Sequence, residues 1–251
     1  MFSIEIKDQI AWVTGGSRGI GRAATLALAK AGCHIAIGYH SKEGEAQSVA
    51  NEVEAMGCKA LIVGGDISRW DDVEKGYGHI EAKLGPVSIL VNSAGIIADN
   101  LFMMLEDEDW HRVLNTNVMG TVHTMKAVVR GMMMKRRGKI INLSSVAATK
   151  GGRGQANYAA SKGAIEALTR STAVELGSKG IAVNCIAPGV IDTEMSAEVV
   201  KLAKDEILSH QLVKRLGTPE EVAAWIVFLA SSFGDFITGQ TIHIDGGMKM
   251  G

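Results

Sequence analysis

A short apolar run, Ile10–Thr14, is followed at once by four glycines within seven residues and then by an alanine-rich segment that extends to residue 31. This succession predicts a strand, a glycine turn and a helix. Glycines let the backbone approach a pyrophosphate, and the free N–H groups and dipole at the helix start favour its charge. A second apolar run at 33–37 and a helical segment at 48–56 follow, which favours a dinucleotide ligand over a glycine turn that binds nothing.

Apolar runs alternate with helical segments along the whole chain. The runs lie at 10–14, 33–37, 59–65, 87–91, 139–143, 181–186 and 241–244. This rhythm predicts an α/β fold, namely a single-domain Rossmann fold with a doubly wound, seven-stranded parallel sheet and helices on both faces. No internal repeat or linker divides the sequence, so residues 1–251 are predicted to form one domain. The amphipathic, charged stretch at about 196–216 is predicted to be a flap that closes over the substrate.

Charge and cysteine content narrow the function classes. Lys and Arg number 26 against 27 Asp and Glu, which gives no reason to expect nucleic acid or a membrane surface as a partner. No apolar run is long enough to span a bilayer, and residues 1–10, with three charged side chains, do not resemble a signal peptide. Cys33, Cys58 and Cys185 lie in apolar runs, which predicts reduced core thiols and a cytoplasmic protein. An organelle stroma or matrix is the alternative if a transit peptide has been removed.

The end of the second predicted strand bears on the choice of cofactor. An NAD site usually carries a carboxylate there for the ribose hydroxyls, whereas this chain reads Gly-Tyr-His-Ser-Lys at 38–42. Arg18, His40 and Lys42 can attract a 2′-phosphate, although Arg18 has the alternative of being a solvated turn residue. NADP(H) is therefore the predicted cofactor. The residues predicted to bind it in these two segments are Gly15, Ser17, Arg18, Gly19, Ile20, Gly21, Tyr39 and His40.

Later strand ends supply the rest of the predicted cofactor site. Asp66 follows the third run and can either accept from the adenine amino group or cap the helix that begins near Trp70. Small residues after the fourth run let a ribose pass close to the backbone, and a turn after the sixth run lies at the same edge of the sheet. The residues predicted to bind the cofactor here are Asp66, Ile67, Asn92, Ala94, Gly95, Pro188, Gly189, Ile191 and Thr193.

A serine, a tyrosine and a lysine follow the fifth predicted strand. Ser145 lies just past its carboxyl end, where ligands bind in open α/β sheets. Tyr158 and Lys162 stand four apart, so a helix places them on one face, where the ammonium is predicted to lower the pKa of the phenol. We predict that Tyr158 is the general acid of a carbonyl reduction and that Ser145 holds the same carbonyl oxygen. Tyr158 and Lys162 are also predicted to border the cofactor.

Asn117 lies within an apolar series at helical spacing. It is either a hydrogen-bonded core residue or a residue that supports a water chain relaying protons through Lys162. A Tyr and a Lys four apart also occur by chance on many helices. Ser145 is not predicted to be a nucleophile, because no glycine elbow surrounds it and no histidine is placed as its base. The seven histidines have no spacing typical of metal ligands. Neither a hydrolase nor a metalloenzyme is predicted, and no metal site is assigned.

Together these motifs resemble the short-chain dehydrogenase/reductase family along nearly the whole chain. The motifs are Thr14-Gly-Gly-Ser-Arg-Gly-Ile-Gly21, Asn92-Ser-Ala-Gly95, Asn117, Ser145, Tyr158-Ala-Ala-Ser-Lys162 and Pro188-Gly189. The resemblance implies a catalytic tetrad of Asn117, Ser145, Tyr158 and Lys162 with a nicotinamide cofactor. It also implies a homotetramer built on the long helices and the C-terminal strand.

Within that family the chain is most similar to the 3-oxoacyl-acyl-carrier-protein reductases. The similarity lies in residues 99–104, 138–142, 154–158, 215–217 and 237–248. It implies NADPH-dependent reduction of a 3-oxoacyl thioester to the 3-hydroxyacyl thioester, with Arg136 and Lys179 meeting an acidic acyl carrier protein. Ser93 and Ala98 depart from the usual asparagine and arginine. Reduction of acetoacetyl-CoA, a polyketide, a small ketone or a sugar stays an alternative, as does a non-catalytic NADP-binding scaffold.

Overall fold

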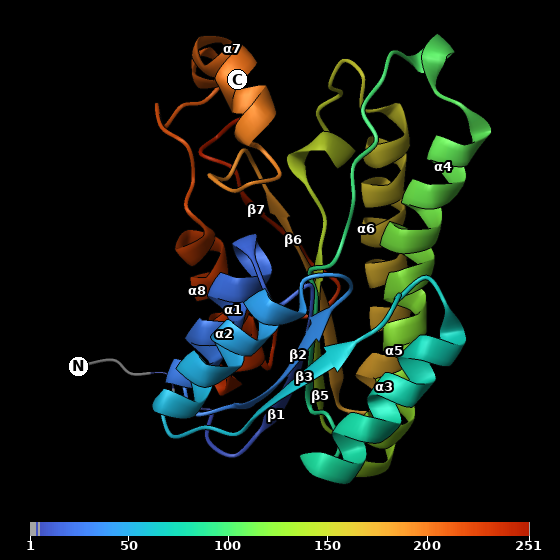
Figure 1. Cartoon of the computed structure of the whole chain (residues 1–251), viewed down its shortest axis with the longest axis vertical. Helices are drawn as coiled ribbons and strands as arrows, with labels where there is room; N and C mark the ends of the chain where they lie inside the picture. Colours follow the sequence, from blue (N-terminus) through green and yellow to red (C-terminus); the bar gives the residue numbers. More distant parts are fainter. Residues whose placement is uncertain (1–3, 5, 251) are drawn as a thin grey trace.

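The computed structural model describes residue 4 and residues 6–250, and its centre is one parallel sheet (Figure 1). Seven strands of the described chain pair in the order β3-β2-β1-β4-β5-β6-β7. Their bounds are β1 Ile10–Thr14, β2 His34–Tyr39, β3 Ala60–Gly64, β4 Ile89–Asn92, β5 Gly138–Leu143, β6 Ile181–Pro188 and β7 Thr241–Ile244. Every pairing is parallel. The predicted doubly wound, seven-stranded sheet is confirmed, with strand bounds shifted by up to two residues.

Helices cover both faces of this sheet. The α-helices are α1 Gly19–Lys30, α2 Glu43–Ala55, α3 Trp70–Lys83, α4 Asp107–Leu114, α5 Gly120–Lys135, α6 Ala156–Gly177, α7 Ala197–Ser209 and α8 Pro219–Ala230. Short turns of other helix types are η1 Phe102–Met104, η2 Asn115–Met119, η3 Val146–Ala148 and η4 Ser232–Gly234. In Figure 1, α1, α2 and α8 lie on one side of the sheet and α3, α5 and α6 on the other. Every helix in the described part of the chain is too short or too polar to traverse a lipid bilayer.

Each strand divides its side chains between two hydrophobic cores. In β1, Ala11 and Val13 pack with α1, α2 and α8, whereas Ile10 and Trp12 pack with α3 and α5. All five residues of β1 are buried, because the sheet is covered on both faces. Burying a large aliphatic side chain contributes roughly 1.5–3 kcal/mol, so the doubly covered strands hold the carboxyl edge of the sheet in a fixed position.

The three cysteines are free thiols. Cys33 and Cys185 are buried, and Cys58 is half-buried. Burial raises the pKa of both Cys33 and Cys185 to about 12, which keeps these thiols protonated. The predicted absence of disulfides therefore agrees with the described structure, although Cys58 is less deeply placed than a core residue.

The predicted flap contains a helix above the carboxyl edge of the sheet. This helix, α7, has a break at Ala203, where the backbone leaves helical geometry (φ −137°, ψ 31°), and Ile207 is its one buried residue. Ser196 precedes it and its Oγ bonds to the Ile191 carbonyl oxygen at 2.5 Å. In Figure 1, α7 stands apart from the layers that cover the sheet. Closure of this segment over a substrate remains a prediction.

Candidate active site

The glycine turn between β1 and α1 has the close contacts that a phosphate site requires. Gly15 and Gly19 adopt positive φ, and a Cβ built at Gly15 would lie 2.9 Å from the Cα of Ala94. A Cβ at Gly21 would overlap the Gly15 carbonyl oxygen. Arg18, the N-cap of α1, gives no side-chain hydrogen bond to the helix start, and the first turn holds no acidic residue. Uncapped N–H groups in a glycine cradle suit the pyrophosphate of a dinucleotide.

Two further segments meet this turn. Thr14 Oγ1 accepts hydrogen bonds from the backbone N–H groups of Ser93 and Ala94, both at 3.1 Å, and so fixes the loop after β4 beside the turn. From the other side, Thr193 Cγ2 lies 3.6 Å from a Cβ built at Gly19. The structure therefore brings three of the predicted cofactor segments together. Thr14 was not among the predicted site residues, and its place as the last residue of a strand is the signal that identifies it.

The side chain of Asn92 points into the protein interior, away from the glycine turn. Its Nδ2 donates to Asn142 Oδ1 at 2.9 Å, and its Oδ1 accepts from Thr124 Oγ1 at 2.7 Å. The side chain is 4% exposed. Asn92 can therefore meet a cofactor only through its backbone, and its side chain serves to join β4, β5 and α5.

Asp66 closes a turn just after β3. Its Oδ1 accepts from the Ser68 N–H at 2.9 Å, whereas the N-cap of α3 is Arg69. The alternative that Asp66 caps α3 is therefore wrong, because the helix begins one turn later. Partial burial opposes ionisation, yet the hydrogen bonds from Ser68 and the charges of His40 and Arg69 hold the pKa of Asp66 below its usual value. An ionised Asp66 thus remains available as an acceptor.

Arg18 and Lys42, two of the cations predicted to attract a 2′-phosphate, each have a carboxylate partner. Arg18 Nη1 lies 3.4 Å from Glu194 Oε2, and both side chains are exposed. Lys42 Nζ lies 3.6 Å from Glu45 Oε1. Burial and then Glu43 raise the pKa of Tyr39. Exposed ion pairs of this kind contribute at most about 1 kcal/mol, so a phosphate can displace them.

Ser145, Tyr158 and Lys162 meet beyond the end of β5. Tyr158 lies in the first turn of α6, and its side chain is hydrogen-bonded to that of Ser145. Lys162 Nζ lies 5.5 Å from the centroid of the Tyr158 ring and donates to the Leu143 carbonyl oxygen at 2.8 Å. The three side chains come from a strand end and one helix face, as the four-residue spacing predicts. The arrangement can hold a carbonyl oxygen between two hydroxyl groups.

The protonation of this group differs from the prediction. Burial raises the pKa of Tyr158 to about 12, the hydrogen bond with Ser145 lowers it, and the charge of Asp99 raises it. Burial lowers the pKa of Lys162 to about 8. The prediction that the ammonium lowers the pKa of the phenol is wrong for this arrangement, because burial dominates the shift and the Lys162 ammonium is hydrogen-bonded to the Leu143 carbonyl. Tyr158 therefore holds its proton at neutral pH, as a general acid must.

Asn117 is completely buried in the π-helical turn η2 that separates α4 from α5. Its Oδ1 accepts from the Ile96 N–H at 2.9 Å, and its Nδ2 donates to the Ile96 carbonyl and to Ser161 Oγ, both at 3.0 Å. All of its side-chain atoms are thus used in joining η2, the loop after β4 and α6. The interpretation as a hydrogen-bonded core asparagine accounts for the side chain, and a role in proton relay remains a prediction.

The turn after β6 is held against β7. The Gly189 N–H donates to the Ile244 carbonyl at 2.9 Å, and a Cβ at Gly189 would lie 2.7 Å from the Cα of Asp245. Ile191, which is buried, pairs as an isolated bridge with Gly217. These contacts set Pro188 through Thr193 at the same sheet edge as Ser145. No side chain could replace Gly189 without moving the backbone of residue 245.

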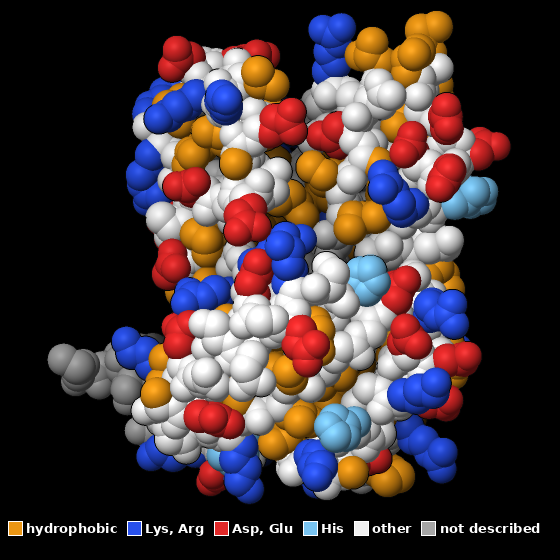
Figure 2. Space-filling model, in the orientation of Figure 1, with side chains coloured by type: hydrophobic (Ala, Val, Ile, Leu, Met, Phe, Trp, Pro, Cys, Tyr) orange, Lys and Arg blue, Asp and Glu red, His pale blue; other side chains and the backbone are white. Residues whose placement is uncertain are grey.

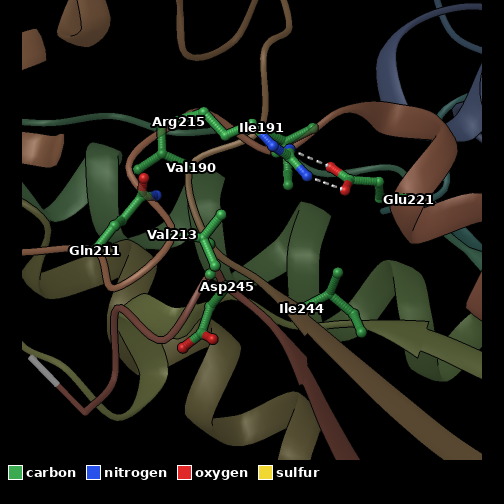
Figure 3. Close-up of a pocket in the computed structure, with 11 residues that line it drawn as sticks. Val190, Ile191, Gln211, Val213, Arg215, Glu221, Ile244 and Asp245 are labelled. Carbon is green, nitrogen blue, oxygen red and sulfur yellow. Dashed lines mark hydrogen bonds and ion pairs between the residues drawn. The ribbon is translucent and has the colours of Figure 1, made fainter.

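A pocket of about 130 Å³ lies behind this turn (Figure 3). Its walls include Gln211, Val213 and Asp245, and at one end Arg215 forms two hydrogen bonds with Glu221 at 2.8 and 2.6 Å. These bonds lower the pKa of Glu221 to about 2. None of the four predicted catalytic residues lines this pocket.

Arg136 and Lys179 lie at the opposite edge of the sheet. Arg136 ends α5 in a left-handed conformation and donates to the Ser178 carbonyl at 3.0 Å. Gly138 and Ile181, which follow these two basic residues, pair as the first residues of β5 and β6. Ser145 follows the far end of β5. Within one chain, the predicted carrier-binding residues are therefore remote from Ser145 and the predicted catalytic residues beside it.

Comparisons with known proteins agree with this geometry. The family described as Enoyl-(Acyl carrier protein) reductase matches residues 15–249. The 3-oxoacyl-(acyl-carrier-protein) reductase FabG of Staphylococcus epidermidis is 39% identical, covering 97% of this chain and all of that protein. The protein of the same name from Vibrio harveyi is 41% identical and covers 98% of this chain and all of that protein.

Solved structures are similar over nearly the whole chain. A gluconate 5-dehydrogenase from Burkholderia cenocepacia J2315, in complex with NADP and tartrate, superposes with a TM-score of 0.93 at 32% identity. It covers 99% of this chain and 98% of its own. A putative gluconate dehydrogenase from Agrobacterium tumefaciens has a TM-score of 0.94 at 31% identity, with 99% of each chain covered.

Proposed function

This chain belongs to the short-chain dehydrogenase/reductase family and is an oxidoreductase, and from that premise we propose that it reduces a 3-oxoacyl thioester to the 3-hydroxyacyl thioester. NADPH supplies the hydride when it is bound. Tyr158 gives its hydroxyl proton to the carbonyl oxygen, and Ser145 donates a hydrogen bond to the same atom. Lys162 carries positive charge beside the phenol, and Asn117 holds the loop after β4 against α6.

The proposal of an acyl substrate is supported by the hydrophobic side chains that border the cleft. Figure 2 shows a hollow between the two upper lobes, with hydrophobic side chains on its walls. Exposed hydrophobic residues lie on η1 and the segment before it on one side, and on α7 and its neighbouring segments on the other (Figure 1). They are Leu101, Phe102, Met103 and Met104, and Met195, Val199, Leu202 and Leu212. Burying an acyl chain against such surfaces is favourable in free energy, whereas a sugar acid requires polar groups as hydrogen-bond partners.

NADP(H) is the cofactor that fits the proposal. The end of β2 carries no carboxylate within residues 38–42, and Arg18, at the start of α1, forms only an exposed ion pair that a phosphate can displace. The similar gluconate 5-dehydrogenase was solved with NADP. The free thiols are consistent with our further proposal that the enzyme works in a reducing cytoplasm.

We also propose that the substrate is presented by an acyl carrier protein to a homotetramer. The acidic carrier would meet Arg136 and Lys179, which one chain places far from its own cleft. The long helix α5 has 16 residues and so spans about 24 Å, and antiparallel pairing of two copies would bring the Arg136 end of one toward the cleft of the other. Met133 and Met134 on α5 and Val174 on α6 are exposed, which supports an apolar contact there.

Comparison of substrates tests the proposed reaction. NADPH oxidation is expected with both acetoacetyl carrier protein and acetoacetyl-CoA, and the KM is expected to be lower for the carrier-bound substrate. Reduction of either substrate is expected to be slower with NADH than with NADPH. Keto-gluconate is the alternative substrate for comparison, because two similar solved structures are described as gluconate dehydrogenases. Turnover of the sugar acid without turnover of either thioester would refute the acyl assignment.

Replacing the exposed residues of η1 is expected to weaken binding of long acyl chains. Phe102 is 74% exposed, and covering roughly 60 Å² of apolar surface contributes about 1.5 kcal/mol, or about tenfold in affinity. Phe102→Ser should therefore raise KM about tenfold for a medium-length 3-oxoacyl thioester and leave KM for acetoacetyl-CoA unchanged. Phe236→Ser is the control, since Phe236 is fully exposed and precedes the start of β7. Equal effects of the two variants would exclude this surface.

A further inference from the structure

The loop that follows β4 is bound to the start of α6, the helix that carries Tyr158. The Asn100 N–H donates to the Gly154 carbonyl oxygen at 2.9 Å. The Asn157 side chain, which is completely buried, donates to the Ala98 carbonyl oxygen at 3.0 Å. Because one of these contacts lies on each side of residue 99, the backbone there is held against the end of α6 that carries Tyr158.

Asp99 is the charged residue at the centre of this contact. Gln155, the N-cap of α6 and three residues before Tyr158, donates from Nε2 to Asp99 Oδ2 at 3.2 Å. Burial is the main cause that raises the pKa of Tyr158, the hydrogen bond with Ser145 lowers it, and the charge of Asp99 raises it further. The geometry and the charge thus agree that the Asp99 carboxylate lies near the hydroxyl of the proposed acid.

The charge of Asp99 is exposed and has little compensation. Within the described chain, Asp99 forms no ion pair. Residues 96–109 contain neither Lys nor Arg, and Figure 2 shows acidic side chains gathered on the lobe that carries α4. The acidic residues of this stretch are Asp99, Glu106, Asp107, Glu108 and Asp109. This side of the cleft is therefore negatively charged.

The facing loop before α6 carries two cations, and neither forms an ion pair with Asp99 in the described structure. Lys150 donates to the Met248 carbonyl oxygen at 2.9 Å, toward the C-terminal segment. Arg153 is exposed and lies two residues before Gln155. The Asp99 carboxylate therefore keeps its negative charge toward the cleft.

We propose that Asp99 is a specificity-determining residue, which excludes substrates that carry a carboxylate close to the reacting carbonyl. When the carbonyl oxygen lies between Ser145 and Tyr158, a free 3-oxo acid or a sugar acid brings its own negative charge near Asp99, and like charges repel. A 3-oxoacyl thioester is neutral at this position, because its phosphate lies at the far end of the pantetheine arm. The inference rests on the proposed function for the position of the carbonyl.

Asp99→Asn tests the charge, since it keeps an oxygen that accepts from Gln155. Acetoacetate and methyl acetoacetate are the probes, because they present the same 3-oxo group with and without a negative charge. At saturating NADPH, Asp99→Asn is expected to raise kcat/KM for acetoacetate about tenfold, as removal of one nearby like charge does in a partly hydrated site. It should change kcat/KM for the ester less than twofold. A change in the acid strength of Tyr158 affects both probes and cancels in their ratio.

Salt provides a measurement that a purely structural role would not change. Charges at a protein surface are screened beyond about 10 Å at 0.1 M salt. Added salt should therefore raise the wild-type ratio of acetoacetate to ester kcat/KM, and should leave the ratio of Asp99→Asn nearly unchanged. Ala98→Arg keeps Asp99 and adds a cation beside it, so it should shift the ratio in the same direction as Asp99→Asn.

Glu175→Gln is the matched control. It removes the same charge from an exposed position of α6 that lies 17 residues beyond Tyr158, or about 25 Å along the helix. The ratio of the two probes should equal that of the wild type. An equal shift in Glu175→Gln and Asp99→Asn would overturn the inference, because it would report the net charge of the protein.

Binding measurements separate this inference from the proposed reaction. A ketone cannot be reduced in the complex with NADP⁺, so calorimetry measures the affinity of that complex for both probes without turnover. Asp99→Asn is expected to raise the affinity for acetoacetate about tenfold and to leave the affinity for the ester unchanged. Failure to reduce any thioester or ester would remove the proposed function and leave this comparison in force. An unchanged affinity for acetoacetate in a folded Asp99→Asn protein would overturn the inference.

Discussion

Tyr158→Phe is expected to lower kcat for reduction by about 10³-fold, within the range of ~10²–10⁴ that a positioned general acid contributes. The variant removes the proton that the structure keeps on the phenol, whose pKa burial raises to about 12. It leaves the ring, its contact with Lys162 and the glycine turn in place. Affinity for NADPH, measured by fluorescence titration, should therefore change less than twofold.

Tyr77→Phe supplies the control. Tyr77 lies on α3, where its hydroxyl donates to Glu81 at 3.3 Å and its ring stacks on Trp12 with centroids 6.4 Å apart. This variant removes a phenolic hydroxyl whose hydrogen bond runs to Glu81, and it should keep wild-type kcat. Retained turnover in Tyr158→Phe, with a functioning Tyr77→Phe control, would remove Tyr158 as the acid and leave water or Ser145 to supply the proton.

The parts of the fold that sequence predicts well are those determined by local chemistry. The glycine turn requires a strand before it and a helix after it, because only that setting provides the close backbone contact of Gly15 with Ala94. The spacing of Tyr158 and Lys162 likewise determines their shared face once a helix is given. Strand ends of a parallel sheet then meet at one edge, which places Ser145 beside them without any knowledge of loop structure.

The features that sequence does not predict depend on packing between distant segments. The upward direction of the Tyr158 pKa depends on burial by surrounding elements, and the Lys162 ammonium is hydrogen-bonded to the Leu143 carbonyl on another element. The inward turn of Asn92 depends on Asn142 and Thr124, which lie on other elements. Similarity to carrier-binding reductases points to Arg136, but only the sheet topology shows that it lies at the opposite edge from Ser145.

A single added methyl group in the glycine turn is expected to lower both the stability of the protein and its affinity for NADPH. In Gly21→Ala the new Cβ would overlap the Gly15 carbonyl oxygen and lie 2.8 Å from its carbon, both backbone atoms. Because neither can rotate away, α1 and the turn must separate. The free energy of unfolding in urea is expected to fall by roughly 3 kcal/mol, at the upper end of overpacking effects, despite the better helix propensity of alanine. Affinity for NADPH should fall at least about tenfold, since the phosphate cradle is the part displaced.

Gly44→Ala is the matched change in another helix. Gly44 lies in the first turn of α2, and a Cβ there would meet no atom within 4 Å. Its stability should stay within about 1 kcal/mol of the wild type, on the stabilising side, and NADPH affinity should be unchanged. If Gly21→Ala behaved like Gly44→Ala in both measurements, the close approach of α1 to the turn would not be what forms the cofactor site. Loss of stability with full retention of NADPH affinity would separate the two roles and assign Gly21 to helix packing alone.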